Sequence, residues 1–503
     1  MRGGIMRLKE VFEGIEIDPS FKNVEVVGIS DYSKQCKPGF MFIAVQGNKE
    51  DGNNFIKEAI ERGAKVIVHN NSFPVDGLLP KSKNVIFIGV KDTREILPKL
   101  SANFYKHPSS KIKVIGVTGT NGKTTTTHII ESILKKAGFK TGLIGTINYR
   151  FGERIIPALN TTPGALQLQE LLFNMWQENI EYTIMEVSSH GLDQGRVEGI
   201  DFKVGIFTNI SIDHLDYHKT FENYFNAKAK LFERLSSSSW AIVNIDDVQG
   251  KKILLRTTAK TITYGINNPA DVEAQNISLN IKGSSFLVNT PYGEVEISTP
   301  LIGMHNIYNI LAGISLGIAE NIPLEIIKEG VEKVQCVSGR LELIDTGQPF
   351  KVFVDYAHTE DALRNVLSSL RTLSQGKIIV VFGCGGERCK EKRPLMGKVA
   401  SELADFIILT TDNPRSEEPE AIIRDIEKGF PEGFKDYCVI LDRYAAIKEA
   451  ISMAEDNDIV IIAGKGHEAY QIFKNVTVPF DDRIVVKEIL LESNLSRCKY
   501  NHG

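Results

Sequence analysis

The stretch from residue 112 to residue 124, Ile-Lys-Val-Ile-Gly-Val-Thr-Gly-Thr-Asn-Gly-Lys-Thr, decides the fold. The apolar run Ile112–Val117 predicts a buried strand, Gly119–Thr124 predicts a glycine-rich turn, and a helical pattern continues through Ile129–Lys136. A strand, a glycine-rich turn and a helix in this order are typical of a phosphate-binding loop, because backbone N–H groups and the positive end of the helix surround the anion. Lys123 would offset phosphate charge, and the Thr124 hydroxyl would bind Mg²⁺.

The glycines of this turn depart from the standard spacing of a phosphate loop. That pattern places a glycine five positions before Gly122, where this chain has Val117. Gly116 and Gly119 lie on either side of that position. On this motif alone, a glycine-rich turn that binds no ligand stays open as an alternative.

Strand and helix patterns alternate on both sides of the turn, which predicts mostly parallel sheets covered by helices. The first hundred residues mix short apolar runs with helical stretches and end in a proline-containing linker at His107–Lys111. Period-two strands between Asp271 and Pro300 predict a small β-rich insert. From Gly339 onward a strand–helix unit repeats, with expected strands at Val352–Val354, Ile378–Phe382, Phe406–Thr410, Cys438–Leu441 and Ile459–Ala463.

We therefore predict an α/β protein of three domains. Residues 1–108 would form the first, and residues 109–338 a central phosphate-loop domain with a mostly parallel sheet and the β-rich insert. Residues 339–503 would form a doubly wound, Rossmann-like domain, in which ligands gather at the carboxyl ends of the strands.

Composition narrows the class of protein. The 503 residues are 42% hydrophobic and 24% charged, with a formal net charge of -4, so nothing favours nucleic-acid binding. We find no apolar run long enough to span a membrane and no apolar signal core near the N-terminus. Six scattered cysteines, among them Cys384 and Cys389, lack a paired zinc-binding spacing and are expected to be reduced thiols. We expect a cytoplasmic protein.

Three further stretches carry polar groups that suit a phosphate site. Glu186 ends an apolar strand and could hold Mg²⁺, although a glutamate at a strand end is more often an ordinary surface group. Two histidines and two aspartates fall within Asp213–His218, where a metal or phosphate contact and a satisfied polar loop remain equally open. Lys228 and Lys230 by themselves indicate a solvated helix face.

Taken together and in order, these pieces resemble the Mur ligase family over essentially the whole chain. The matching segments are Gly119–Thr124, Glu186–His190, Asn209–His218, Ala227-Lys228, His305–Asn309, Gly339-Arg340 and Asp355–His358. Within the family, the sequence is most similar to the MurE branch.

The resemblance implies ATP and Mg²⁺ as cofactors. The residues that would bind ATP are Gly119, Thr120, Asn121, Gly122, Lys123, Thr124, Thr125, Asn306, Arg340 and Asp355. Catalysis would depend on Lys123, Glu186, His214 and Lys228. Magnesium would be held by Thr124, Glu186, His214 and Lys228, the last as a carbamate, which turns its positive charge into a negative one.

The resemblance also implies a UDP-N-acetylmuramoyl-dipeptide as acceptor. Its contacts would be Ser33, Asn48, Lys49, Glu50, Asn160, Thr161, Thr162, Ser188, Gln194 and Arg196. The family usually has Asp-Ser-Arg around the serine, whereas this chain has Tyr32-Ser33-Lys34, which keeps the hydroxyl and changes its neighbours.

Three segments of the last domain follow apolar strands and should therefore meet at one edge of the sheet. They are Gly383–Arg388, Asp412–Arg415 and Gly464–Glu468. Arg388 and Arg415 are suited to carboxylates, and Glu468 can accept from an ammonium group. Asp412-Asn-Pro-Arg415 resembles the motif of family members that add meso-diaminopimelate. The expected amino-acid contacts are Arg388, Asp412, Asn413, Pro414, Arg415, Gly464 and Glu468.

The sequence thus predicts an ATP-dependent ligase of peptidoglycan precursor synthesis that forms an amide bond through an acyl phosphate. A rigid rotation of the third domain near Ser338-Gly339 would close the site. Alternatives are L-lysine as the added amino acid, a folylpolyglutamate synthetase-like ligase, a phosphate-loop kinase or ATPase, and a protein that only senses UDP-sugar peptides. The expected partners are small-molecule substrates, with neither nucleic acid nor membrane, and a monomer is the favoured state.

Overall fold

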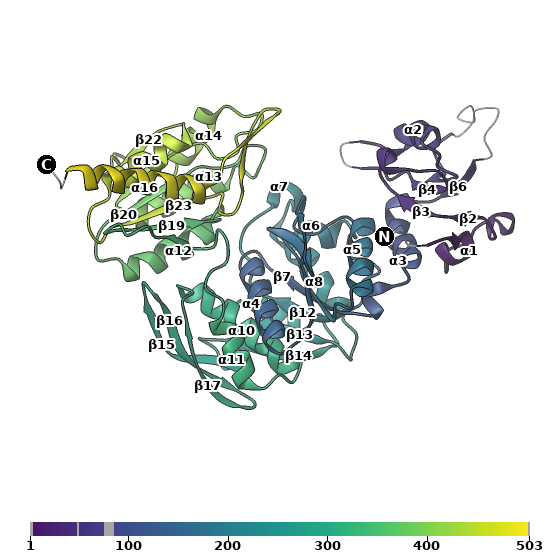
Figure 1. The fold of residues 1–503 in the computed structure, drawn as a ribbon, viewed down its shortest axis with the longest axis horizontal. Coiled ribbons are helices and arrows are strands. Elements are labelled where there is room, and N and C mark those ends of the chain that lie inside the picture. Colours follow the sequence, from purple (N-terminus) through teal and green to yellow (C-terminus); the bar gives the residue numbers. More distant parts are fainter. Residues whose placement is uncertain (1–3, 48–49, 75–84, 501–503) are drawn as a thin grey trace. The chain divides into compact units, whose positions relative to one another are not determined.

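The computed structural model describes residues 4–47, 50–74 and 85–500, with side chains described up to Glu492. The chain gathers into two compact units. Figure 1 shows the helices and strands with their labels. The first comprises Met1–Gly116, Phe139–Gly205 and Lys230–Ser239. The second comprises Val117–Gly138, Ile206–Ala229 and Trp240–Gly503.

A four-stranded parallel sheet forms the N-terminal part of the first unit. Its strands are β3 (Gly28–Ser30), β4 (Phe40–Ile43), β5 (Val66–Asn70) and β6 (Ile86–Val90). A pair of two-residue strands, β1 (Met6–Arg7) and β2 (Glu25–Val26), lies outside this sheet. The accompanying helices are α1 (Leu8–Val11), α2 (Ile56–Glu61) and α3 (Thr93–Phe104). The apolar run Val24–Ile29 of the sequence therefore contributes to two strands, because β2 pairs with β1 whereas β3 pairs with β4.

An eleven-stranded sheet follows, in the order β10-β9-β8-β11-β7-β12-β13-β14-β15-β16-β17. Its first strands in the chain are β7 (Lys113–Thr118), β8 (Thr141–Ile144), β9 (Asn148–Phe151), β10 (Arg154–Pro157), β11 (Tyr182–Glu186) and β12 (Phe202–Phe207). The others are β13 (Trp240–Asn244), β14 (Lys260–Gly265), β15 (Val272–Asn280), β16 (Gly283–Thr290) and β17 (Gly293–Thr299).

The predicted β-rich insert is present as β15, β16 and β17, and it continues the large sheet instead of forming a separate one. Tyr264 of β14 pairs in parallel with Val272 of β15. The β15–β16 and β16–β17 pairs are antiparallel. Two adjacent pairs of residues are thus enough to extend the sheet edge into the two hairpins.

The helices of this region lie along the sheet. In the first unit they include α5 (Ala165–Gln177) and α6 (Ser189–Asp193), and in the second α4 (Lys123–Lys136), α7 (Leu215–His218), α9 (Gly250–Leu254), α10 (Met304–Ala319) and α11 (Leu324–Glu332). Helix α8 (Phe221–Glu233) carries Lys228. Figure 1 shows α4, α10 and α11 side by side, and α4 contacts both of the others.

The C-terminal sheet has the order β18-β19-β23-β20-β21-β22. Its strands are β18 (Glu342–Ile344), β19 (Lys351–Asp355), β20 (Ile378–Phe382), β21 (Phe406–Leu409), β22 (Tyr437–Val439) and β23 (Ile459–Ala463), with β18 alone antiparallel to its neighbour. The helices are α12 (Glu360–Leu373), α13 (Lys392–Leu403), α14 (Pro419–Glu427), α15 (Arg443–Met453) and α16 (Asp482–Tyr500). A hairpin of β24 (Tyr470–Phe473) and β25 (Val476–Pro479) stands beside this sheet.

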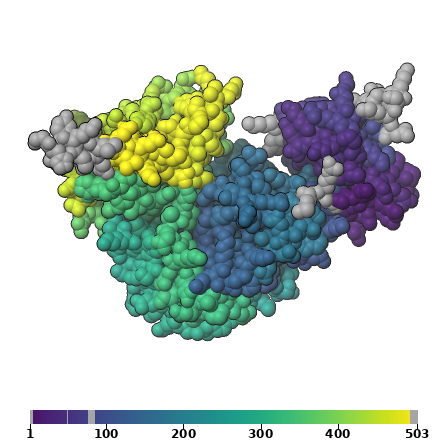
Figure 2. Space-filling model, in the orientation of Figure 1, coloured from purple at the N-terminus to yellow at the C-terminus, as the bar shows by residue number. Residues whose placement is uncertain are grey.

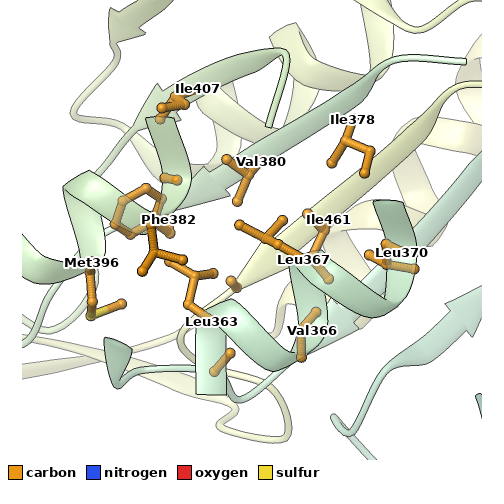
Figure 3. Close-up of a cluster of buried hydrophobic side chains, with 14 of the residues drawn as sticks. Leu363, Val366, Leu367, Leu370, Ile378, Val380, Phe382, Met396, Ile407 and Ile461 are labelled. Carbon is orange, nitrogen blue, oxygen red and sulfur yellow. The ribbon is translucent and has the colours of Figure 1, made fainter. Parts of the chain in front are cut away.

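Both faces of the C-terminal sheet are covered, as the doubly wound prediction requires. Alternate residues of each strand point to opposite faces. Figure 3 shows Leu363, Leu367 and neighbouring apolar residues of α12 against Phe382 and Val380 of β20. The other face packs against Ile447 of α15 and residues of α16. Figure 2 shows residues of the C-terminal region (yellow) on the surface of the molecule, and the two apolar clusters of this region are buried beneath such surface residues.

The apolar pattern of the sequence predicts helices at Ala362–Leu373 and Ile422–Gly429, and local capping explains why both begin earlier in the structure. Thr359 accepts a hydrogen bond from the Ala362 N–H at 3.3 Å and caps α12, which therefore starts before the apolar pattern does. Pro419 occupies the first turn of α14, where its missing N–H costs nothing. The linker predicted near His107 contains a short 3₁₀ helix, Pro108–Ser110.

No described helix is long and apolar enough to cross a membrane. Among the described side chains, Cys36, Cys336, Cys384, Cys389 and Cys438 are free, and histidine, cysteine and carboxylate side chains form no metal-binding cluster.

The packing in Figure 3 yields a stability prediction. Phe382 is fully buried, so Phe382→Ala should lower the free energy of unfolding by about 3–5 kcal/mol through lost burial and a residual cavity. Leu395 lies in helix α13, which covers the same sheet, but it is 42% exposed. Leu395→Ala should therefore change the free energy of unfolding by about 0.5 kcal/mol or less. Urea denaturation of both variants checks this, and equal losses would contradict the assigned core.

Candidate functional site

The phosphate loop of the second unit requires its two glycines. Gly119 has φ +155°, and a Cβ there would lie 1.9 Å from Thr208 Oγ1. Gly122 has φ +85°, in the left-handed region, and a Cβ there would lie 2.3 Å from Asn309 Oδ1. Gly116 has another purpose, since it lies inside β7, where a Cβ would press on the Phe202 ring at 2.8 Å. The departure from the standard spacing is therefore explained by packing at Gly116 and by the turn at Gly119.

The loop folds around its own lysine and leads directly into α4. Lys123 Nζ donates to the carbonyl oxygens of Gly119 and Thr120, both at 2.8 Å. Gly122 caps α4 with no side chain, so the N–H groups of the first helical turn receive no side-chain cap there. A cradle that a Cβ would fill, a helix N-terminus and a lysine fit a nucleotide phosphate.

The segment Asn209–His218 supports the loop from a second strand. The side chain of Asn209 accepts from the Asn121 N–H at 2.9 Å, and Thr208 Oγ1 donates to the Asn121 carbonyl at 2.6 Å. His214 adopts φ 55°, and its N–H donates to Asp213 Oδ1 at 2.8 Å. Burial alone would raise the pKa of Asp213, but the charges of His214, His358 and Lys392 outweigh it and lower that pKa. Asp213 is therefore a buried anion beside the predicted ligand His214.

Lys228 lies under the phosphate loop and is 1% exposed. Its Nζ donates to the Gly119 carbonyl at 2.7 Å and lies 4.6 Å from the centre of the Tyr224 ring. Burial lowers the pKa of the Lys228 ammonium well below its ordinary value of 10.5, and the charge of Lys123 adds to this effect. A solvated helix face is thus the wrong interpretation of Lys228. Lys230, two residues further on, is half-exposed and pairs with Asp193 at 3.1 Å.

Arg340 joins the phosphate loop from the C-terminal sequence. Its Nη2 donates to Thr124 Oγ1 at 2.9 Å, and its guanidinium lies over the Tyr356 ring at 4.6 Å. Asp355 is buried and accepts from the N–H groups of Leu341 and Ala357, at 2.6 and 2.7 Å. Burial raises the pKa of Asp355 above its ordinary value. Its carboxylate thus fixes the chain beside Arg340.

Asn306, the remaining predicted nucleotide residue, lies in the first turn of α10. Its amide donates to the Ile302 carbonyl at 2.9 Å, and its Oδ1 accepts from Asn309 at 3.1 Å. Asn309 is the residue whose Oδ1 lies against Gly122. The phosphate loop, Asn306 and Arg340 therefore come together within the second unit.

Most predicted acceptor residues form one network in the first unit. Glu186 is fully buried, and its carboxylate accepts from the N–H and the hydroxyl of Thr146, at 2.8 and 2.9 Å. Thr162 Oγ1 donates to the Glu186 carbonyl at 2.9 Å and accepts from the Ser188 N–H at 2.9 Å.

The same network continues through hydroxyl, carbonyl and amide groups. Arg196 donates to the Thr162 carbonyl at 2.8 Å and to Gln194 Oε1 at 2.6 Å. The hydroxyls of Thr146 and Thr161 lie 3.2 Å apart, and the Asn160 carbonyl accepts from Tyr149 at 2.5 Å.

The residues predicted for the uridine side lie elsewhere in the first unit. Ser33 is buried, and its hydroxyl donates to Glu58 at 2.6 Å. Glu50 is exposed. Asn48 and Lys49 lie outside the described residues.

The predicted amino-acid residues of the second unit converge at the carboxyl ends of β20, β21 and β23. A Cβ at Gly385 would lie 3.1 Å from Arg415 Nη1 and 3.6 Å from Arg388 Cγ, so the Arg415 guanidinium approaches the loop that carries Arg388. A Cβ at Gly464 would lie 2.7 Å from Asp412 Oδ2. Three loops distant in sequence are therefore in contact.

Asn413, Lys465 and Glu468 tie two of these loops together. Asn413 Nδ2 donates to Glu468 Oε2 at 2.9 Å, and Lys465 Nζ donates to both of them, at 3.2 and 3.1 Å. Lys465 is fully buried, so its charge is held by Glu468. Arg415 has φ 53° and donates from Nη1 to the Gly386 carbonyl at 2.7 Å. Pro414 precedes it and limits the backbone of the turn.

Comparisons with known proteins agree with this arrangement. The sequence matches the "Mur ligase family, catalytic domain" over residues 25–105, the "Mur ligase middle domain" over residues 117–317, and the "Mur ligase, glutamate ligase domain" over residues 339–466. The chain belongs to the Mur ligase family.

Relatives within the Mur ligase family cover nearly the whole chain. A UDP-N-acetylmuramoyl-L-alanyl-D-glutamate–2,6-diaminopimelate ligase of Clostridium tetani is 45% identical over 97% of this chain and 100% of its own length. The protein of the same name from Caldanaerobacter subterraneus is 43% identical, with the same coverage. A solved structure of a ligase with that name is 31% identical, with a TM-score of 0.69 over 97% of this chain and 99% of its own. A MurF structure from Acinetobacter baumannii shares the fold, with a TM-score of 0.67 at 20% identity.

The predicted three-domain α/β fold is thus confirmed, and the chain is a ligase of the Mur family. The finer domain boundaries and the roles of individual residues stay predictions. The sequence analysis gave no role to several side chains that build the site: Thr208, Asn309, Tyr356 and Lys465. Asn309 and Tyr356 lie inside the matching segments His305–Asn309 and Asp355–His358. Lys465 lies inside a segment already selected, so its neighbours Gly464 and Glu468 could have signalled it. Nothing in the local sequence indicates that Thr208 and Asn309 occupy the space that a Cβ would need at Gly119 and at Gly122.

Lys228 generates a pH prediction. Because its folded-state pKa is lowered, the folded chain binds this proton less than the unfolded chain does below pH 10.5. The free energy of unfolding that Lys228 contributes should therefore rise with pH in that window, by up to about 1.4 kcal/mol per pH unit. Lys228→Met should remove this slope, and Lys230→Met on the same helix should keep it. Denaturation of the three proteins between about pH 7 and about pH 9 measures it; parallel pH profiles for Lys228→Met and the parent would show that the amine is not buried as described.

Proposed function

We propose that this Mur ligase adds meso-diaminopimelate to the D-glutamyl γ-carboxylate of UDP-N-acetylmuramoyl-L-alanyl-D-glutamate, with conversion of ATP to ADP and phosphate, in cytoplasmic peptidoglycan precursor synthesis. The observation that carries the proposal is the convergence of Arg388, Arg415 and Glu468 at one sheet edge. The names of the relatives that match over the full chain agree with this substrate.

ATP would be bound by the phosphate loop of the second unit. The Lys123 ammonium and the N–H groups that open α4 would offset the negative charge of the β- and γ-phosphates. Arg340, stacked on Tyr356 and bonded to Thr124, would add a third positive group near the triphosphate. Asn306, whose amide donates to the Ile302 carbonyl, would also contact the nucleotide.

The expected magnesium ligands are the Thr124 hydroxyl and the His214 imidazole of the second unit and the Glu186 carboxylate of the first. The hydroxyl and the carboxylate are oxygen donors of the kind that a hard cation prefers. When bound, Mg²⁺ would reduce the charge repulsion between the acceptor carboxylate and the γ-phosphate. Lys228 suits the further role of a carbamate, because only a neutral amine attacks carbon dioxide and burial favours the neutral form. Its carbamate would supply another anionic oxygen donor.

The acceptor would lie along the network of Thr162, Ser188 and Arg196, with Ser33, Glu50 and the undescribed Asn48 and Lys49 on its uridine side. Its γ-carboxylate would attack the γ-phosphate of ATP, with departure of ADP and formation of an acyl phosphate. The amine of the incoming amino acid would then attack the acyl carbon and expel phosphate through a tetrahedral intermediate. Water must be excluded at this stage, because it would hydrolyse the acyl phosphate.

The amino acid would be recognised by charge at both ends. Arg415, held by the Gly386 carbonyl, would use its free guanidinium edge for the distal carboxylate. Glu468 and Asp412 would receive an ammonium group, and Asn413 would hold the Glu468 carboxylate in place. L-lysine has no distal carboxylate, so it would leave a guanidinium without its anion.

Substrate identity is tested by ligation of UDP-N-acetylmuramoyl-L-alanyl-D-glutamate with either meso-diaminopimelate or L-lysine. We expect release of ADP and phosphate only when acceptor and diaminopimelate are both present. Arg415→Met should lower kcat/KM for diaminopimelate by about 10²-fold, since a buried polar site loses its partner. Lys474→Met removes a neighbouring exposed charge that pairs with Glu418, and should retain activity. Faster ligation of lysine by the parent protein would overturn the assignment.

The carbamate has a separate test. Lys228→Ala should reduce ligation by about 10²-fold or more, because a charge aligned with the developing transition state is lost. Short-chain carboxylic acids added to this variant should restore part of the activity by filling the cavity with a carboxylate. Full activity of Lys228→Ala without any additive would remove Lys228 from the mechanism.

A further inference from the structure

Beneath the three loops of the amino-acid pocket lies an ion pair that the proposed chemistry does not use. Arg443, the first residue of α15, is 1% exposed, and Asp482, the first residue of α16, is fully buried. Arg443 Nε and Nη2 donate to the two oxygens of Asp482, both at 2.8 Å. This two-pronged geometry fixes the plane of the guanidinium.

The same guanidinium reaches two carbonyls at the carboxyl end of the sheet. Nη2 donates to the Ala463 carbonyl at 3.0 Å, and Nη1 lies 3.5 Å from the Thr411 carbonyl. Ala463 ends β23 immediately before Gly464, and Thr411 immediately precedes Asp412. Two of the three loops that carry predicted amino-acid contacts therefore begin at a carbonyl facing Arg443.

Those carbonyls lie where the strand ladder ends, so their orientation is not set by sheet pairing alone. The Thr411 carbonyl also accepts from Gln471 at 3.2 Å, and Gln471 donates to the Asp412 carbonyl at 2.9 Å. Burial alone would lower the pKa of Arg443, but Asp482, with contributions from Asp412 and Glu468, raises it. Arg443 thus stays charged, and its charge acts on two pocket carboxylates as well as on its partner.

We propose that Arg443, oriented by Asp482, is a positioning residue that sets the geometry of the Asp412–Arg415 and Gly464–Glu468 loops and thereby the affinity for the incoming amino acid. This inference rests on the proposed function, because that function assigns the pocket to the amino acid. It concerns neither the nucleotide nor the sugar-peptide acceptor. The alternative is a purely structural role, in which the Arg443–Asp482 pair only stabilises the packing of α15 and α16.

Replacing the pair by apolar residues separates the two roles. A buried ion pair exchanged for apolar side chains often retains stability, whereas loss of one partner leaves a buried charge alone. Arg443→Met or Asp482→Leu singly should therefore lower the melting temperature, and the double variant should recover it to within about 5 °C of the parent. The double variant still lacks the Arg443 N–H groups, so the Ala463 carbonyl loses its guanidinium donor and the Thr411 carbonyl keeps only Gln471.

Steady-state kinetics of the full chain provide the decisive measurement. In the double variant, KM for meso-diaminopimelate should rise about 10- to 100-fold, whereas KM for ATP and for the acceptor should change less than about twofold. Arg443→Lys should give an intermediate KM, since a lysine reaches one carbonyl but lacks the planar fork. Arg371→Met is the control, because Arg371 also donates to a carboxylate, that of Asp405 at 2.7 Å, and to a carbonyl, that of Leu403, but lies outside these loops. This variant should leave all three KM values unchanged.

The outcomes distinguish this inference from the proposed function. If the parent ligates diaminopimelate and the double variant has its normal KM, the positioning role is overturned. A rise of all three KM values together would also overturn it, because it would indicate general loosening. If the parent does not ligate diaminopimelate, the proposed function fails instead. Amide hydrogen exchange at residues 412–415 and 464–468 should still be faster in the double variant than in Arg371→Met, and equal exchange would again exclude a positioning role.

Discussion

The close approach of the backbone at Gly119 and Gly122 is the constraint on which the rest of the second unit depends. Neither position has room for a Cβ, because Thr208 and Asn309 occupy the space that it would need. The chain can therefore turn from β7 into α4 at these two positions, which a larger residue would prevent. The buried Lys228 bonds to the Gly119 carbonyl of the same turn. The same turn, Gly119–Gly122, thus forms the expected phosphate site, binds the Lys228 side chain and leads into α4.

A second theme is the use of buried charge to fix loops. Lys465 holds Asn413 and Glu468. Arg393, with fully buried side chain, bonds to Glu417 and reaches the Gly385 carbonyl at 3.3 Å. Such pairs add little net stability, because desolvation offsets most of the attraction. These pairs instead fix the conformation of the loops, because a guanidinium or ammonium group bonded to several acceptors restricts how the loops around it can be arranged.

The loops of the C-terminal sheet illustrate how a doubly wound fold makes a binding site. Parallel strands end at the same edge, so every strand–helix connection there adds a segment to one pocket. Gly385, Arg415 and Gly464 meet in this way although they are distant in the chain. The left-handed conformation of Arg415, unusual for a residue with a side chain, is maintained by backbone bonds to Ile472 and Lys474 of the β24 strand region. The hairpin outside the sheet therefore helps to shape the pocket.

The sequence by itself determined the order of elements, the phosphate loop and the family. These depend on local patterns: apolar periodicity found β7, β20 and β23 within one or two residues, and ordered motifs carried the resemblance. The strand break at Val27 and the helix start set by Thr359 depend on local capping and on partners elsewhere, and the apolar pattern did not predict them. Only the tertiary structure decided that Lys228 is buried, that Gly116 is a packing glycine and that Arg443 lies under two loops. The physical reason is that burial and long-range hydrogen bonds belong to pairs of residues distant in the chain, about which local sequence carries no information.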